Sequence, residues 1–198
     1  LERYLVWRDD TWTVFAGYPW FLDWGRDSLI ALRGVIAAGR FDIAAGILMA
    51  FARFEYHGTL PNMIRGHDHS NRDTSDAPLW FFTATADYLR LSGDRQLLDA
   101  DCAGRPFRKI LHSIVHHYRQ GTPNGIRMDP ESALIYSPSH FTWMDTNHPA
   151  GTPRQGYPIE IQALWFAALQ VMAELEPEGN WRPLAAQVQS SIRELYVR

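Results

Sequence analysis

The sequence predicts an all-α protein, built as part of a toroid of helical hairpins, with a minor β-hairpin near residues 126–136. Two observations predict this fold class. Apolar residues recur at helical spacing in about six segments, and long polar loops precede the first, third and fifth of them. An α/α toroid places its long, alternate connections on one rim, so we expect antiparallel helix pairs around one continuous core.

The expected helices have start and stop signals. Pro78 and Pro158 stand where the first turn of a helix accepts proline. Gly39 and Gly93 follow runs of helical periodicity and predict helix ends, while Asp27 is placed to cap the first helix. The expected helices span residues 27–39, 42–57, 78–91, 110–121, 158–176 and 181–196, with a break at 104–106 before the fourth.

Composition narrows the class of protein. With 198 residues, 46% hydrophobic and 21% charged, the chain can form one good core or part of a larger one. The net charge of −3 argues against a nucleic-acid partner, and the apolar runs are too short to span a membrane. The single cysteine, Cys102, excludes an internal disulfide and fits a reducing compartment, so we expect a cytoplasmic protein.

Aromatic and charged residues crowd the start of the first helix in "GYPWFLDWGRDSLIALRG". Trp20 and Trp24 accompany Arg26 and Asp27, a combination that suits a ligand with an apolar face and a polar rim, such as a sugar ring. Arg26 and Asp27 could hold two vicinal hydroxyls, because one donates and the other accepts hydrogen bonds. The structural alternative is a buried Arg–Asp pair and a helix cap.

A second cluster, Asp76 and Trp80, repeats this combination at the start of the third helix. A third precedes the fifth helix, where Asp145 follows Trp143 and Met144. A carboxyl group beside apolar side chains stays protonated more readily and can donate a proton to a leaving group. In a toroid, the starts of alternate helices converge on one cavity.

Arg154 and Glu160 complete the third cluster. The structural alternative is that Asp145 caps a turn and that Glu160 occupies the first turn of a helix, where the helix dipole favours a negative charge.

Other possible sites are weaker. The segment 67–69 (His-Asp-His) is interpreted as a solvated turn, and His112 and His116 as helix surface. The sequence contains no glycine-rich phosphate loop. We therefore expect no cofactor and no metal ion.

Five segments together resemble a known family: "AGYPWFLDWGRDSLIALRG", "GTLPNMIRG", "SDAPLWFF", "TWMD" and "TPRQGYPIEIQALWFAAL". In order and spacing, from about Ala16 to Ala173, they are similar to the amylo-α-1,6-glucosidase domain of glycogen debranching enzymes. The resemblance implies an (α/α)6 toroid and a glycoside hydrolase related to the glucoamylases. It further implies removal of α-1,6-linked glucose branches from glycogen or limit dextrin, with inversion.

The resemblance also implies roles for particular residues. Asp145 would be the general acid, and Arg26 and Asp27 would hold the non-reducing glucose. The family's general base would lie after Arg198. Residues 1–198 would then form the N-terminal half of a six-hairpin catalytic domain, inactive by itself. The rest of the domain, or self-association, would cover its open edge.

Inverting hydrolysis needs an acid and a base carboxyl group with a water molecule between base and sugar. The four tryptophans would stack on glucose faces, and the charged residues and Asn62 would bind hydroxyls. The expected partner is a branched α-glucan, and the expected site consists of the catalytic Asp145 with the substrate-binding Trp20, Trp24, Arg26, Asp27, Asn62, Asp76, Trp80, Trp143, Arg154 and Glu160.

Two other classes remain open. A non-catalytic carbohydrate-binding module would use the same aromatic residues without an acid. A different toroid enzyme, such as a trehalase-like hydrolase or a terpenoid-type cyclase, is the second alternative. The many Arg and Asn residues argue against a cyclase, whose cavity would be mostly apolar.

Overall fold

The computed structural model describes residues 2–8, 11–17, 21–66, 68–146 and 151–197. Its main elements are α1 (Gly25–Ala37), α2 (Phe41–Arg53), α3 (Ala77–Ser92), α4 (Phe107–Gln120), α5 (Ile159–Leu175) and α6 (Trp181–Tyr196), with short 3-10 helices η1 (Glu2–Tyr4) and η2 (Gln96–Asp99). All six predicted helices are present in the predicted order, which confirms the mainly α class. None of the described helices is both long and apolar enough to cross a membrane.

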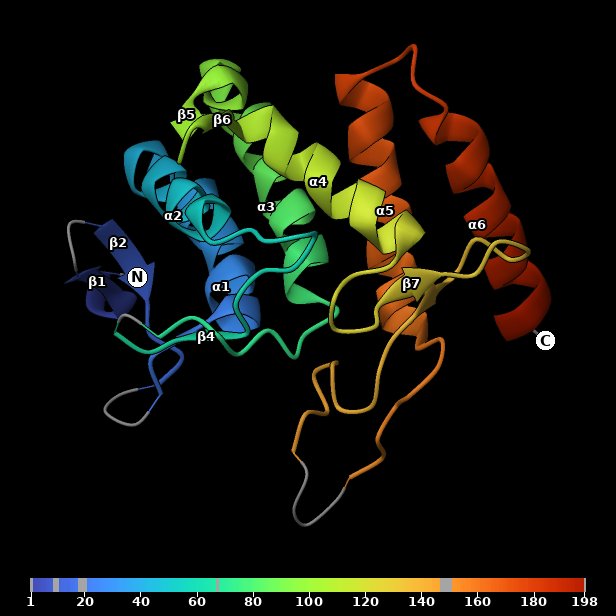
Figure 1. Ribbon diagram of the computed structural model, residues 1–198. Coiled ribbons are helices and arrows are strands. Elements are labelled where there is room, and N and C mark those ends of the chain that lie inside the picture. Colours follow the sequence, from blue (N-terminus) through green and yellow to red (C-terminus); the bar gives the residue numbers. More distant parts are fainter. Residues whose placement is uncertain (1, 9–10, 18–20, 67, 147–150, 198) are drawn as a thin grey trace.

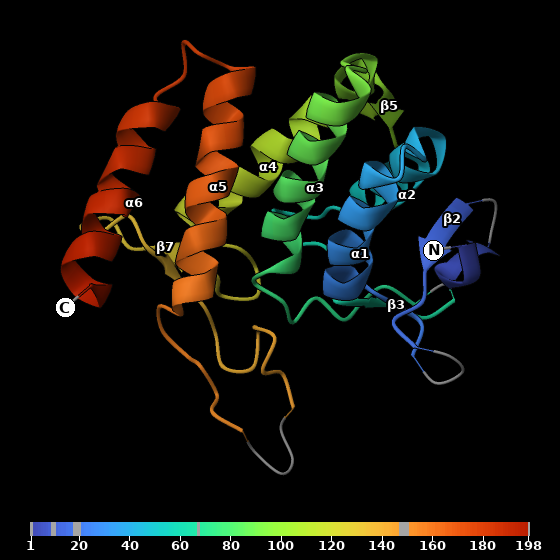
Figure 2. The same cartoon turned by 180° about the vertical axis from the view of Figure 1, so that it is seen from behind.

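The helices form two layers. Helices α1, α3 and α5 lie side by side with α3 in the middle, while α2 and α4 pack on one face of this row and α6 packs against α5 (Figures 1 and 2). The N-terminal ends of α1, α3 and α5 lie at the same rim, together with the long loops that precede α3 and α5 (Figure 1). This arrangement is that of part of a helical toroid.

Short strands form two-stranded antiparallel ribbons in the described part of the chain. They are β1 (Leu5–Arg8) with β2 (Thr11–Val14), β3 (Asp23–Trp24) with β4 (Met63–Ile64), β5 (Asp101–Cys102) with β6 (Arg105–Pro106), and β7 (Arg127–Met128) with β8 (Ile135–Tyr136). The β7–β8 ribbon is the predicted hairpin. The other three were not predicted, and β5–β6 occupies the expected break before α4.

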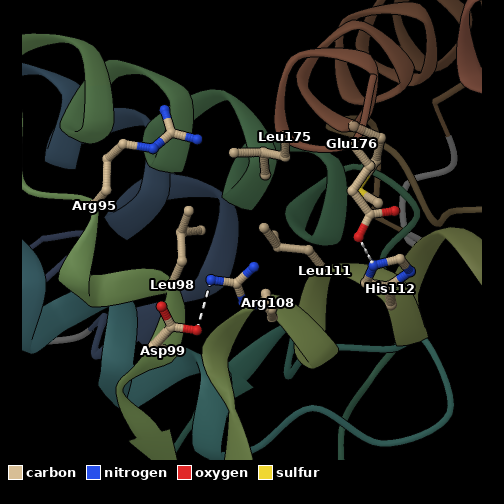
Figure 3. Close-up of a pocket in the computed structure, with 9 residues that line it drawn as sticks. Arg95, Leu98, Asp99, Arg108, Leu111, His112, Leu175 and Glu176 are labelled. Carbon is tan, nitrogen blue, oxygen red and sulfur yellow. Dashed lines mark hydrogen bonds and ion pairs between the residues drawn. The ribbon is translucent and has the colours of Figure 1, made fainter. Parts of the chain in front are cut away.

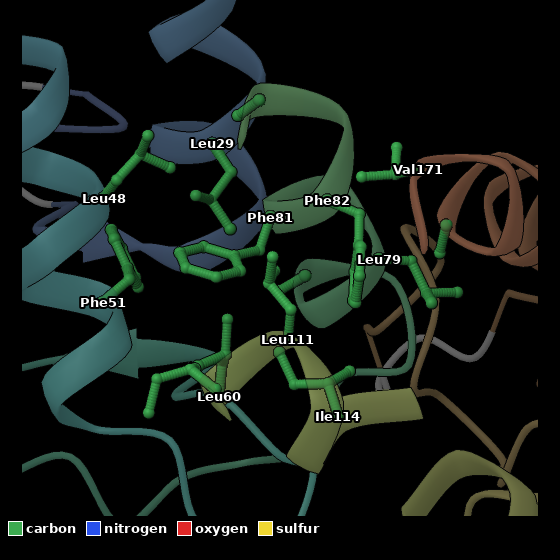
Figure 4. Packing of buried hydrophobic residues seen from close by; sticks show 14 of the residues in the cluster. Leu29, Leu48, Phe51, Leu60, Leu79, Phe81, Phe82, Leu111, Ile114 and Val171 are labelled. Carbon is green, nitrogen blue, oxygen red and sulfur yellow. The ribbon is translucent and has the colours of Figure 1, made fainter. Parts of the chain in front are cut away.

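The hydrophobic core lies between the two helix layers (Figure 4). Each neighbouring helix contributes a nearly inaccessible side chain: Leu29, Phe51, Phe81 and Leu111. On α5, the fully buried Trp165 stacks on Tyr118 with ring centroids 6.0 Å apart. Its indole nitrogen donates a hydrogen bond to the Ala133 carbonyl at 3.1 Å. The core thus fixes the loop between β7 and β8 against α5.

The first helix begins earlier than the sequence predicted. Trp24 is in extended backbone, paired with Met63 in the β3–β4 ribbon, and the helix starts directly after it at Gly25. Asp27 therefore does not cap α1; it is exposed in the first turn, where the helix dipole favours its charge. The predicted ends are confirmed, because Gly39 and Gly93 adopt φ values of 73° and 72° just after α1 and α3.

Gly25 is a position where we expect a large loss of stability on substitution. An added Cβ atom would lie 2.5 Å from the Pro61 carbonyl oxygen and 3.2 Å from the Ala77 Cβ atom. Because the first clash is with backbone, Gly25→Ala should lower the free energy of unfolding by about 2 kcal/mol or more. Gly34 on the same helix is the matched control, since nothing lies within 4 Å of its added Cβ atom. Gly34→Ala should raise that free energy by up to about 1 kcal/mol. Equal melting temperatures for the two variants would contradict this prediction.

Candidate functional site

A pocket of about 270 Å³ opens at the rim where α1 begins. It is lined by Ala16, Phe21, Trp24, Arg26, Asp27 and Asp145. Three of these residues precede α1, Arg26 and Asp27 lie in its first turn, and Asp145 comes from the loop before α5. The pocket combines two aromatic side chains with two carboxyl groups and a guanidinium group.

Arg26 joins the start of α1 to the start of α3 and to the loop before α5. Its Nε atom donates a hydrogen bond to Asp76 at the start of α3. Its Nη2 atom donates to the Thr142 carbonyl oxygen at 2.8 Å, and Nη1 donates to Asp145 Oδ2 at 3.3 Å. Residues separated by 50 and by 119 positions in the sequence are thus brought together by one side chain.

The carboxylates of Asp76 and Asp145 stabilise the positive charge of Arg26. Burial lowers the pKa of its guanidinium group, but the hydrogen bonds and charges of Asp76 and Asp145 raise it by more, so that the net shift is upward. The Asp76 side chain is only 4% exposed and also accepts a hydrogen bond from the Thr74 hydroxyl at 2.7 Å. Arg26 and Asp76 therefore form a buried, hydrogen-bonded ion pair.

This geometry changes the interpretation of two predicted residues. The structural alternative was correct in that Arg26 is paired within the protein, but its partners are Asp76 and Asp145 rather than Asp27. That Arg26 and Asp27 together hold two hydroxyls of a ligand stays a prediction: both line the pocket, and the guanidinium is hydrogen-bonded to Asp76, Thr142 and Asp145. Asp27 is exposed and lines the pocket. It is thus the more accessible of the two for a ligand.

A buried polar network positions the loop that carries Asp145. Ser75 donates its backbone N–H to the Phe141 carbonyl at 2.7 Å, and its hydroxyl lies 2.8 Å from that of Ser137. Tyr118 donates to the Ser75 carbonyl at 2.9 Å, and complete burial raises the pKa of this tyrosine, which keeps it a donor. Sequence analysis missed these residues, because serines and threonines in a polar loop carry no signal that they are buried.

Asp145 shares the pocket with the aromatic side chains of Phe21 and Trp24, but its hydrogen-bond partner is a charged group. Its contact is with the Arg26 cation, and its side chain is 28% exposed. Trp143 is 57% exposed, and Trp80 is half-buried against the core. Neither tryptophan lines the pocket. Trp20 lies outside the described residues.

Arg154 and Glu160 form their own ion pair at the start of α5. The Arg154 Nε atom donates to Glu160 Oε1 at 2.7 Å, and a second hydrogen bond joins Arg154 Nη2 to Glu160 Oε2. Both side chains are about a quarter exposed, and neither lines the pocket.

Two buried polar atoms near the pocket lack partners among the described residues. They are the indole nitrogen of Trp24 and the side-chain oxygen of Asn62. The Asn62 backbone carbonyl accepts a hydrogen bond from Gly25 at 2.9 Å, which places this residue beside the start of α1. Buried polar groups are nearly always satisfied, so these two atoms are exceptions beside the start of α1.

A second pocket, of about 300 Å³, lies at the opposite rim between η2, α4 and the end of α5 (Figure 3). Two pairs of side chains lie in its lining: Arg108 with Asp99 at 2.6 Å, and His112 with Glu176. The His112 side chain is therefore hydrogen-bonded to Glu176. Throughout the described residues, no group of three or more His, Cys, Asp or Glu side chains could hold a metal ion.

Comparison with known proteins identifies the family. The family model for amylo-alpha-1,6-glucosidase matches residues 3–198. The chain is also 27% identical, over 229 aligned positions, to a glycogen debranching enzyme of Saccharomyces cerevisiae, and the match covers 86% of this chain. It covers only 15% of the yeast protein, so the chain corresponds to a small part of that relative. Since the family model spans nearly all of its length, the chain belongs to the amylo-alpha-1,6-glucosidase family.

Proposed function

We propose that this chain forms part of a glycoside hydrolase that removes α-1,6-linked glucose branches from glycogen or limit dextrin, with inversion. One observation carries the proposal: in a member of this family, Arg26 holds the Asp145 carboxyl group in a pocket at the start of α1.

In this proposal Asp145 is the general acid. Arg26 donates to Oδ2, while Oδ1 has no hydrogen-bond partner among the described residues. A protonated carboxyl group with its proton on Oδ1 keeps Oδ2 as the acceptor for Arg26. It can then protonate the oxygen of the leaving sugar as the glycosidic bond breaks. Arg26 is thus a positioning residue that fixes the orientation of the acid.

The terminal glucose would bind between the remaining pocket residues. Trp24 lines the pocket and offers a ring face to the sugar. The exposed Asp27 carboxylate accepts hydrogen bonds from hydroxyls. Asn62 does not line this pocket and remains a candidate for a contact elsewhere on the glucan. Trp80, Trp143, Arg154 and Glu160 remain candidates for contacts with parts of the glucan outside this pocket.

The general base belongs, in this proposal, to a part of the catalytic domain that residues 1–198 do not include. Glu160 is the nearest alternative in sequence, but its carboxylate is committed to Arg154. The open edge of the helix layers would then meet the remaining helices of the domain.

The anomer of the first product tests the proposed reaction. The full-length protein is incubated with a short α-1,6-branched gluco-oligosaccharide, and the released glucose is followed by proton NMR before it mutarotates. Inversion predicts that β-glucose appears first and α-glucose only later, because water attacks the face opposite the leaving group. Release of α-glucose first would exclude an inverting mechanism, and release of no glucose would exclude the proposed activity.

A further inference from the structure

A groove runs along the far side of the β3–β4 ribbon from the candidate pocket. It consists of two adjoining hollows of about 220 and 420 Å³, which share Arg53, Phe54 and His69. The inner hollow lies between the β1–β2 ribbon and the end of α2, and the outer one continues past the loop that follows α2. Together they reach the size typical of small-molecule sites, about 300–1,000 Å³.

The groove and the candidate pocket lie on opposite faces of one ribbon. Successive side chains of a strand point to opposite sides. Asp23 is paired across the ribbon with Ile64, and both line the inner hollow, whereas the next residue, Trp24, lines the candidate pocket. The two sites are therefore separate but share a wall only two strands wide.

The inner hollow has an apolar lining with polar groups at its side. The apolar part is formed by Trp12, Phe51, Phe54 and Ile64. Beside it, Arg8 donates to Asp23 at 2.6 Å in a largely buried ion pair. The His69 ring lies against Phe54, with centroids 4.6 Å apart, and extends the aromatic surface into the outer hollow.

Tyr56 gives the outer hollow an exposed aromatic ring with packing neighbours on two sides. Its side chain is 57% exposed. The Arg72 guanidinium lies 5.8 Å from the centroid of the Tyr56 ring. The His57 ring packs edge-on against it, with ring centroids 4.3 Å apart. Arg72 is itself fixed by donating to the Phe54 carbonyl at 2.7 Å. A ring held in this way loses little conformational entropy when a ligand binds.

The charges along the groove balance. Three arginines face three carboxylates among the lining residues: Arg8, Arg53 and Arg72 against Asp23, Glu55 and Asp68. A lining without net charge does not select phosphate-bearing or cationic ligands. Aromatic faces combined with many fixed donors and acceptors instead suit a neutral, polyhydroxylated ligand with an apolar face.

We propose that this groove is a second carbohydrate site, which binds an unbranched α-1,4-linked segment of the same glucan whose branch end enters the candidate pocket. The choice of an α-glucan rests on the proposed function. Binding on both faces of the β3–β4 ribbon anchors a large polymer next to the pocket without any contact to the bond that is cleaved.

Substitution of the exposed rings tests the groove. Tyr56→Ala and His69→Ala are made in the full-length protein, and the affinity for maltoheptaose is measured by calorimetry. Each variant should bind about five- to tenfold more weakly, the effect of losing one aromatic contact. Both should cleave a short α-1,6-branched oligosaccharide with unchanged kcat/KM. Tyr196→Ala is the control, because this tyrosine lies on α6, at the other end of the molecule from β1 and β2 (Figure 1).

The outcomes separate this proposal from the proposed function. Unchanged maltoheptaose affinity in both ring variants would overturn the proposal that the groove binds a glucan. A loss of kcat/KM on the short substrate that equals the loss of maltoheptaose affinity would also overturn this proposal, because Tyr56 would then act on the pocket. Tyr56 and His69 line the groove and not the pocket, so a loss of maltoheptaose affinity in these variants reports on the groove even if the protein cleaves no α-1,6 bond, which is the failure of the proposed function alone.

Discussion

Replacing Asp145 by asparagine is expected to lower the turnover of α-1,6-linked substrates by about a thousandfold. Asparagine keeps the shape of the side chain and an oxygen that can accept the Arg26 hydrogen bond, but it has no acidic proton. General acid catalysis contributes about 10²–10⁴ to a rate, so the loss should fall in this range. The melting temperature should change by no more than about 2 °C, because the Asp145 side chain is already 28% exposed.

A substrate with a different leaving group makes this test specific. Fluoride needs little help from a proton donor, so Asp145→Asn should retain most of its activity toward α-glucosyl fluoride. Asp73→Asn is the control, since Asp73 is exposed in the loop before α3 and lines no described pocket. Near-normal turnover of the α-1,6 substrate would remove Asp145 from the mechanism. An equal loss on both substrates would assign it a role other than proton donation.

The buried pair of Arg26 and Asp76 should show the second large effect. Arg26→Ala or Asp76→Ala alone should lower the free energy of unfolding by about 3–5 kcal/mol, because each leaves a buried charge without its main partner. The double variant should lose clearly less than the sum of the two single losses. Denaturant unfolding of all four proteins measures the coupling.

A charge-preserving variant separates stability from positioning. Arg26→Lys keeps a cation near Asp76, but a lysine cannot reach Asp76, Thr142 and Asp145 together as the planar guanidinium does. We expect it to retain more stability than Arg26→Ala while kcat falls and KM changes little. If the losses of unfolding free energy in the two single variants added up to the loss in the double variant, Arg26 and Asp76 would not be coupled as a pair. An unchanged kcat in Arg26→Lys would contradict the positioning role of Arg26.

The helices were predictable because their signals are local. Apolar periodicity, Pro78 in a first turn and Gly93 after a last turn each act within a few residues, and the observed helices follow them. The start of α1 was misplaced by two residues because its position is set by the pairing of Trp24 with Met63, which is not local. Ribbons of two residues per strand give too short a pattern to recognise.

The site was predictable only in part, for a related reason. Polar and aromatic residue types at the starts of alternate helices indicated that Arg26, Asp76 and Asp145 belong together, and the structure brings these three into contact. Which carboxylate pairs with Arg26 depends on packing between loops, so the sequence suggested Asp27 instead. The exposure of Trp143 and the burial of Ser75 and Ser137 likewise depend on tertiary contacts.

The long-range bonds of Arg26 also bear on the order in which the molecule assembles. The bond to Asp145 closes a loop of 119 residues and the one to Asp76 a loop of 50, and the longer closure costs about 0.8 kcal/mol more in chain entropy. Neighbouring helices such as α5 and α6 are joined by short connections and can pair much sooner. A nascent or partly denatured chain can therefore contain most of its helices while Asp145 is not yet hydrogen-bonded to Arg26. Helical content is then a poor measure of whether the candidate site has formed.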